Sequence, residues 1–121
     1  MLNRRIENNS IVFRNGSVVV LIIEETETDN GITMALRGEL RSDVAHELLD
    51  ELTALATVGI SIMVDFSEVT YITPTILDVF LSVQQLMDSM QKGVLILRKL
   101  PAEIYSEFEK TGTSELLLIE D

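Results

Sequence analysis

The sequence has no cysteine, no tryptophan, two prolines and one histidine among its 121 residues. Without cysteine, a disulfide framework, a zinc–thiolate site and a cysteine nucleophile are all excluded. His46 alone is too little for a transition-metal site or a nucleophile triad, and there is no glycine-rich phosphate loop. We therefore expect a protein that is not an enzyme and that carries no cofactor.

Positive charge is also scarce. Nine Lys and Arg stand against 20 Asp and Glu, which gives a net charge of -11 and repels the phosphates of nucleic acids and anionic lipids. We expect protein partners and no nucleic acid. The most hydrophobic run, Val18 to Ile23, is far shorter than the roughly 20 residues of a membrane-spanning helix. The first ten residues do not resemble a secretory signal, so we expect a cytoplasmic protein without direct membrane insertion.

The N-terminal half reads as strands. Residues 1–17 are a polar leader with room for one extra edge strand at Ile11 to Arg14, closed by Asn15-Gly16, a typical hairpin turn. Strands of about 18–27 and 32–40 follow, separated by a second turn at 29–31. An extra edge strand has unpaired backbone groups, so pairing of two copies through Ile11 to Phe13 is one hypothesis.

From residue 42 onward, helices and strands alternate. Apolar residues recur at helical spacing over 43–56, 74–91 and 101–111, and short apolar runs at 60–64, 94–97 and 116–119 predict strands between and after them. Such alternation produces parallel strands joined by right-handed crossovers. The sequence therefore predicts one α/β domain over residues 18–121, with an antiparallel hairpin, then parallel βαβ units, packed with amphipathic helices.

The stretch from Ile60 to Leu77 organises this pattern. Its apolar run predicts a strand covered on both faces that ends at Asp65, before a polar crossing. Thr73 can cap the next helix and Pro74 fits its first position, which puts Thr75 in the first turn, at the positive end of the helix dipole. Ser42 can cap the helix over 43–56 in the same way.

Three segments carry a resemblance to a known family. They are LRGELRSDVAHELLDEL at 36–52, IMVDFSEVTYITPTIL at 62–77 and KGVLILRKLPAEIYSEFEKTG at 92–112. Together they resemble the STAS domain family, whose best-known members are anti-sigma factor antagonists. In that family the turn after the central strand usually reads Asp-Ser-Ser-Gly, and a kinase that is also the anti-sigma factor phosphorylates the second serine.

The resemblance implies a site at the corresponding turn. This sequence has Thr73, Pro74, Thr75 and Ile76 there, and Thr75 matches the phosphorylated position. The residues implied for partner docking are Ser42, Asp65, Ser67, Thr73, Pro74, Ile76 and Asp78. The implied function is a partner-switching regulator that binds an anti-sigma serine kinase-like ATPase. The alternative is a phosphorylation-independent accessory subunit that binds the ATPase of a lipid-transporting ABC complex.

Two other interpretations of the same residues remain open. Thr73 and Thr75 can simply cap and pack their helix. Glu24-Glu25, Asp65 and Lys99 all follow predicted strands and together are typical of the acidic pocket and lysine of a phospho-receiver. The chain order argues against a receiver, because Asn30-Gly31 turns straight into a second strand where a receiver has a helix. In that case Asp65 holds the turn through side-chain hydrogen bonds.

Overall fold

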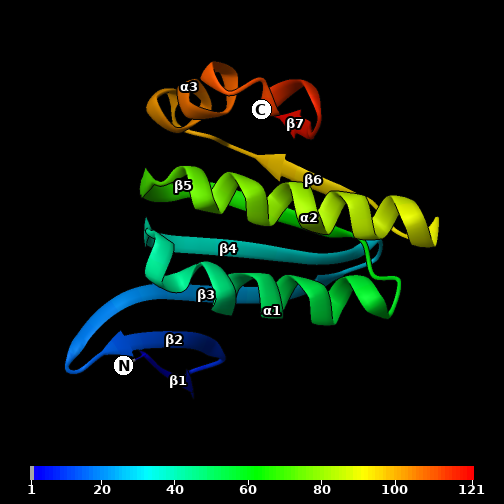
Figure 1. Cartoon of the computed structure of the whole chain (residues 1–121). Coiled ribbons are helices and arrows are strands. Elements are labelled where there is room, and N and C mark those ends of the chain that lie inside the picture. The colour runs from blue at the N-terminus through cyan, green and yellow to red at the C-terminus, as the bar shows by residue number, and fades with distance from the viewer. Residues whose placement is uncertain (1) are drawn as a thin grey trace.

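A computed structural model describes residues 2–121. Seven strands, three α-helices and two short 3-10 helices follow one another along the chain (Figure 1). The strands are β1 (Leu2–Glu7), β2 (Ser10–Asn15), β3 (Val18–Thr28), β4 (Gly31–Leu40), β5 (Ile62–Ile72), β6 (Leu95–Arg98) and β7 (Leu118–Glu120). The helices are η1 (Ser42–Val44), α1 (Ala45–Thr57), α2 (Pro74–Met90), α3 (Ala102–Lys110) and η2 (Thr113–Glu115).

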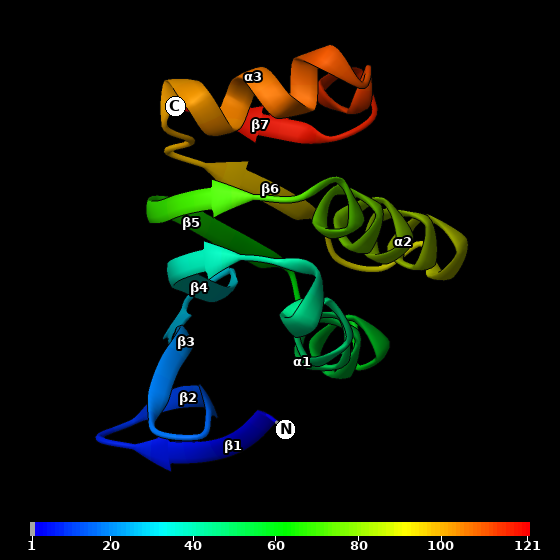
Figure 2. The ribbon, with the colours of Figure 1, turned by 60° about the vertical axis from the view of Figure 1, so that its left-hand side comes forward.

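All seven strands form one mixed sheet in sequential order, β1 to β7. The pairs from β1 to β4 are antiparallel and those from β4 to β7 are parallel, which confirms the predicted fold class. Because the parallel strands are added in one direction, right-handed crossovers put their helices on the same side of the sheet. Figure 2 shows α1 and α2 together on that side, with α3 beside β7 at the end of the sheet.

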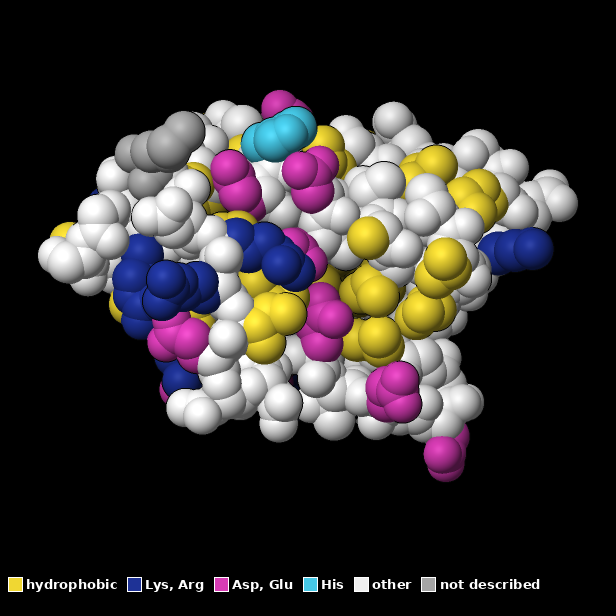
Figure 3. All heavy atoms as spheres, turned by 90° about the horizontal axis from the view of Figure 1, so that it is seen from below, with side chains coloured by type: hydrophobic (Ala, Val, Ile, Leu, Met, Phe, Trp, Pro, Cys, Tyr) yellow, Lys and Arg dark blue, Asp and Glu magenta, His cyan; other side chains and the backbone are white. Residues whose placement is uncertain are grey.

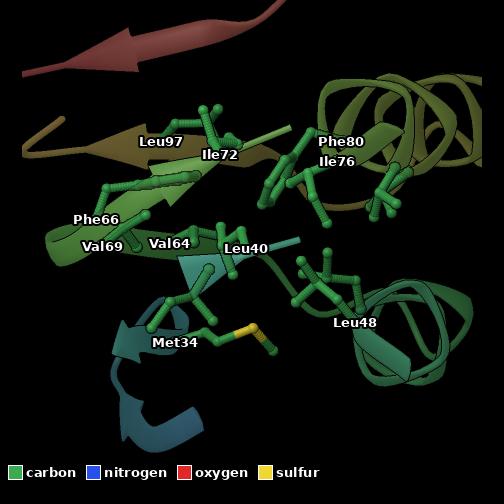
Figure 4. Packing of buried hydrophobic residues seen from close by; sticks show 14 of the residues in the cluster. Met34, Leu40, Leu48, Val64, Phe66, Val69, Ile72, Ile76, Phe80 and Leu97 are labelled. Atoms are coloured by element: carbon green, nitrogen blue, oxygen red, sulfur yellow. The ribbon is translucent and has the colours of Figure 1, made fainter. Parts of the chain in front are cut away.

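The hydrophobic core lies between the sheet and this helix layer. Alternate residues of the strands point toward α1 and α2 and are buried, among them Met34, Val64, Phe66 and Leu97 (Figure 4). The ring of Phe66 lies 5.3 Å from that of Phe80 on α2 and 6.1 Å from that of Phe108 on α3, measured between centroids. Phe66 thus joins the central strand to two helices.

The central strand differs from its prediction in two ways. It is covered on one face only, since Met63 and Asp65 stay partly exposed on the side without α1 and α2. It also continues past Asp65 to Ile72, because its ladder with β4 runs on to the Leu40–Ile72 pair and absorbs two register shifts. The polar residues after Asp65 are therefore part of a strand and not of a crossing.

The N-terminal leader is a strand hairpin. Asn8 and Asn9 have positive φ values of 49° and 68° and join β1 to β2, while Gly16, at 65°, begins the turn between β2 and β3. The predicted edge at Ile11 to Phe13 is wrong, because β2 lies between β1 and β3 and pairs with both. A dimer cannot form through that segment, and β1 is the outer strand instead.

One ion pair holds this hairpin against α1, and a second joins its two strands. The Arg4 guanidinium donates to the Glu51 carboxylate of α1 at 2.6 and 3.3 Å, and Arg14 forms a two-pronged pair with Glu7. Partial burial and the Glu51 charge raise the pKa of Glu25, while Arg4 opposes the rise. Arg4 therefore compensates two neighbouring carboxylates.

We expect Arg4→Ala to lower the free energy of unfolding at neutral pH by about 1 kcal/mol, because a carboxylate pair loses its cation. A carboxyl with a raised folded pKa destabilises the fold while it is ionised. This cost decreases as the carboxyl becomes protonated at lower pH. The deficit of the variant should therefore shrink when the pH is lowered to about 4. Urea unfolding at both pH values measures this, with Lys92→Ala, at an exposed position, as control; a deficit that grows in acid would contradict it.

Candidate functional site

The predicted site lies where β4 and β5 end and the chain turns into helices. The Thr73 backbone N–H donates to the Leu40 carbonyl at 3.0 Å, and the Thr73 hydroxyl donates to the same oxygen at 3.5 Å. These bonds hold the start of α2 beside the start of η1. The carboxyl ends of parallel strands are where α/β proteins commonly build binding sites.

Three hydroxyl groups meet at this junction. Ser42 Oγ donates to Thr75 Oγ1 at 3.2 Å and lies 3.4 Å from Thr73 Oγ1. Ser42 and Thr75 are exposed, and Thr73 is half-buried. We call Ser42, Thr73 and Thr75 the hydroxyl cluster; in it, Thr75 is an exposed residue in the first turn of a 17-residue helix.

The cluster replaces the predicted caps. Thr73 does precede α2 in an extended conformation and Pro74 is the first helical residue, as predicted, but the Thr73 side chain makes no hydrogen bond to the helix. Ser42 begins η1 and caps no helix either. Short polar side chains can hydrogen-bond to several nearby groups. Here the three hydroxyls contact one another, and that of Thr73 also donates to the Leu40 carbonyl at the end of β4. The cap predictions were wrong in this respect.

The other residues predicted on this turn divide between surface and core. Pro74 and Asp78 are exposed, Asp78 one turn after Thr75 on the same helix face. Ile76 is fully buried and packs in the hydrophobic core, where Figure 4 shows it near Phe80. Its side chain therefore does not occupy the space in front of Thr75, and it offers no surface for docking.

Asp65 and Ser67 lie elsewhere. Asp65 pairs in register with Ala35 on β4, five residues before Leu40, which Thr73 contacts, so about 16 Å of strand separates the two places. The Ser67 backbone N–H donates to Asp65 Oδ1 at 2.8 Å, and Lys99 Nζ is 3.9 Å from Asp65 Oδ2. The structure therefore does not bring these two residues to the hydroxyl cluster.

Asp65 is held in its charged form. Partial burial acts to raise its pKa, but hydrogen bonds from Ser67 and the positive charges of Lys99 and Arg98 outweigh this, so the pKa lies below its usual range. An acid with a lowered folded pKa stabilises the fold above its unfolded pKa, and this contribution is lost as the pH falls through the folded value. Asp65 thus stabilises the sheet at neutral pH.

We expect Asp65→Asn to lower the free energy of unfolding by about 1 kcal/mol at neutral pH, since the amide keeps the Ser67 contact but loses the charge. The difference from wild type should begin to shrink as the pH falls below about 4, the usual pKa of an aspartate, and should vanish only below the lowered folded pKa of Asp65. Chemical unfolding across this range tests the expectation. Asp29→Asn, in the exposed β3–β4 turn, is the control, and an equal loss there would overturn it.

The receiver arrangement is incomplete. Asp65 and Lys99 do meet, and Glu24 lies on the same sheet face, one strand beyond Ala35. Glu25, the next residue on the strand, points to the opposite face, which carries the helices. There the charge of Glu51 raises its pKa and that of Arg4 lowers it. Within residues 2–121 no three His, Asp or Glu side chains form a group that could hold a metal ion.

Comparison with known proteins decides the family. The family model described as Mlab, STAS domain, matches residues 23–120, four-fifths of the chain. The chain belongs to the STAS domain family. No curated protein matches it.

Solved structures share the STAS fold. A candidate anti-sigma factor antagonist from Thermotoga maritima matches with a TM-score of 0.71 and 18% identity, over 82% of this chain and 86% of that one. The anti-sigma factor antagonist SpoIIAA in its unphosphorylated form matches with a TM-score of 0.68, 12% identity and coverages of 82% and 88%. Phosphorylated SpoIIAA from Bacillus matches with a TM-score of 0.62 and 13% identity, over 82% of this chain and 91% of that one. The likeness at these identities establishes the fold.

The STAS match begins inside β3, so β1 and β2 precede the matched region. Within that region, sequence reasoning missed one feature next to the hydroxyl cluster. Arg41 lies 4.5 Å above the ring of Tyr71 and pairs with Glu39 at 2.8 Å. Arg41 precedes Ser42 directly, but its contact with Tyr71 depends on the β4–β5 register, which sequence spacing alone does not give.

Among residues 2–121, no helix has both the length and the apolar composition needed to cross a bilayer.

Proposed function

We propose that this STAS domain is a non-enzymatic partner-switching regulator controlled by phosphorylation of Thr75. In its unmodified form it binds a protein partner, an anti-sigma serine kinase-like ATPase, and phosphorylation of Thr75 releases that partner. The observation that carries the proposal is the exposed Thr75 hydroxyl in the first turn of α2, beside Ser42 and Thr73. SpoIIAA, which shares the fold, has been solved in a phosphorylated form, and this likeness in fold supports the proposal.

The surface around Thr75 suits a kinase substrate. The partner transfers the γ-phosphoryl group of ATP to Thr75 Oγ1, so a P–O bond forms, the bond to ADP breaks and the hydroxyl proton passes to a base of the kinase. Ser42 donates its hydrogen to Thr75 Oγ1, so the Thr75 hydrogen is not engaged with Ser42. Nothing in the core has to move for this step, because Ile76 points inward.

The phosphate is compatible with the fold. The first turn of α2 contains no acidic residue, and an anion at a helix N-terminus is stabilised by the helix dipole and free N–H groups. The same phosphate adds about 1.5 to 2 negative charges to a surface that already contains exposed Asp78. The modification thus leaves the domain folded and opposes a partner that must cover Thr75.

The docking surface extends beyond the helix turn. Tyr71 is 45% exposed, and Arg41 stacks on it beside Ser42. Exposed tyrosine and arginine are the residue types that dominate protein–protein binding energy. The proposed surface therefore comprises Ser42, Pro74, Thr75 and Asp78, with Arg41 and Tyr71 at its side.

A second function rests on the composition of the turn. Thr73 and Pro74 replace the acidic residue and first serine usual in the family, and the hydroxyl cluster is hydrogen-bonded internally. Such a cluster is also consistent with a constitutive structural role. In that case the domain is an accessory subunit that binds an ABC ATPase whatever the state of Thr75.

Affinity capture from the protein's own cells separates the two functions. Wild type, Thr75→Val and Thr75→Glu serve as baits, and mass spectrometry identifies the partner and any phosphate on Thr75. A kinase-like ATPase bound by wild type and Thr75→Val, and lost with Thr75→Glu, supports the switch. An ABC ATPase bound equally by all three baits would contradict the switch and support the accessory subunit.

A further inference from the structure

β1 is the open edge of the sheet. In the described chain it pairs only with β2, over six residues and without a register shift. The opposite edge, β7, has three residues and is followed directly by Asp121. Edge strands with free backbone groups pair with further strands unless they are short, bulged, charged or carry proline. β1 has no bulge and no proline, so only its charged residues, Arg4, Arg5 and Glu7, protect it against such pairing.

The outward side of β1 can be assigned. Glu7 and Ser10 flank the two-residue turn, and flanking residues of such a hairpin exchange backbone hydrogen bonds. Alternation then directs the backbone groups of Leu2, Arg4 and Ile6 away from β2. Ile6 also has a side chain that is 69% exposed. The free edge therefore centres on an exposed apolar residue.

Two of the three charges on β1 are paired. Arg4 pairs with Glu51 of α1, which holds the hairpin against the helix, and Glu7 pairs with Arg14 of β2 within the hairpin. Figure 3, which views this edge from below, shows basic and acidic side chains intermixed there, with hydrophobic side chains beside them. Residues 2–15 contain three arginines and one glutamate in a chain of net charge -11. The hairpin is therefore a locally basic segment, and repulsion between two copies is reduced where they meet there.

We propose that β1 pairs with β1 of a second copy, antiparallel, about a twofold axis at Ile6. This register makes Ile6 face Ile6 of the other copy, as a backbone-bonded pair, and makes Arg5 face Glu7 in both directions. The pairing covers the last three residues of each β1, and Arg4 then faces Asn8 at the turn. The strand is thus complementary to itself, as a twofold interface requires. Four strand spacings, about 19 Å, separate β1 from β5, so the dimer leaves Thr75 accessible and does not depend on the switch.

Sedimentation equilibrium of the full chain over about three decades of concentration tests the dimer. The wild type should move from monomer to dimer mass. Ile6→Asp should weaken the dimer about tenfold or more, whereas Val58→Asp, at an equally exposed position (68%), should not. Ile6→Pro, which removes only an outward N–H, should act like Ile6→Asp while the circular dichroism spectrum stays native. A wild type that stays monomeric, or equal effects of Ile6→Asp and Val58→Asp, would overturn the proposal.

Discussion

Replacing Thr75 with glutamate is expected to weaken partner binding by about a hundredfold or more, which corresponds to roughly 3 kcal/mol. The carboxylate puts a permanent charge at an exposed position one turn before Asp78. A partner that covers this turn must strip water from that charge and meet two acids in place of one. Titration calorimetry with the captured partner measures the effect.

Thr75→Val is the matched control for this substitution. Valine keeps the branched shape of threonine and loses only the hydroxyl and its 3.2 Å contact with Ser42. It should bind the partner within about threefold of wild type, because no charge is added. Glutamate at a helix N-terminus should also leave the domain as stable as wild type or slightly more so. Equal partner affinities of wild type and Thr75→Glu would refute the switch, and a loss of stability in Thr75→Glu would show that the lost binding has another cause.

Phe66→Ala is expected to lower the free energy of unfolding by about 3 to 5 kcal/mol. The side chain is fully buried and contacts the rings of both Phe80 and Phe108, so its removal leaves a cavity where β5, α2 and α3 meet. Small domains have about 5 to 15 kcal/mol in total, so this one change removes a large share. Urea unfolding followed by circular dichroism gives the value.

Met63→Ala provides the comparison on the opposite face. Met63 lies three residues earlier on the same strand, but it is half-buried on the face that α1 and α2 leave open. Its loss should cost less than half as much as that of Phe66, since it gives up less burial and opens no enclosed cavity. Equal costs would mean that another layer covers the open face in solution, which would contradict a one-sided core.

Much of this fold follows from local sequence signals. The period-two alternation around Met34 and Leu36, the proline that starts α2 and the glycine after each helix predict the order of strands and helices. The covered face of the central strand could not be predicted, because Met63 and Val64 are both apolar. Which of them is buried depends on where the crossovers place α1 and α2, and that is a property of the strand order.

At the N-terminus and at the site, contacts between residues far apart in the sequence could not be predicted from local signals. Asn8-Asn9 is a weaker hairpin signal than Asn-Gly, and Arg4 and Arg5 make β1 look like a polar leader, although Arg4 is paired through space with Glu51. Pro74 places Thr75 in the first turn of α2, whereas its choice as a phosphorylation candidate comes from the resemblance to the STAS family. Its contact with Ser42 joins residues 33 positions apart, and only the parallel pairing of β4 and β5 brings them together.

The most direct test of the switch is phosphate transfer by the captured partner. The purified partner is incubated with ATP and either the wild type or Thr75→Val, and phosphopeptide mapping then locates the phosphate. We expect one phosphate on Thr75 of the wild type, none on Thr75→Val, and release of the partner as the phosphate accumulates. Absence of phosphate from Thr75, or a phosphorylated chain that stays bound to its partner, would contradict it.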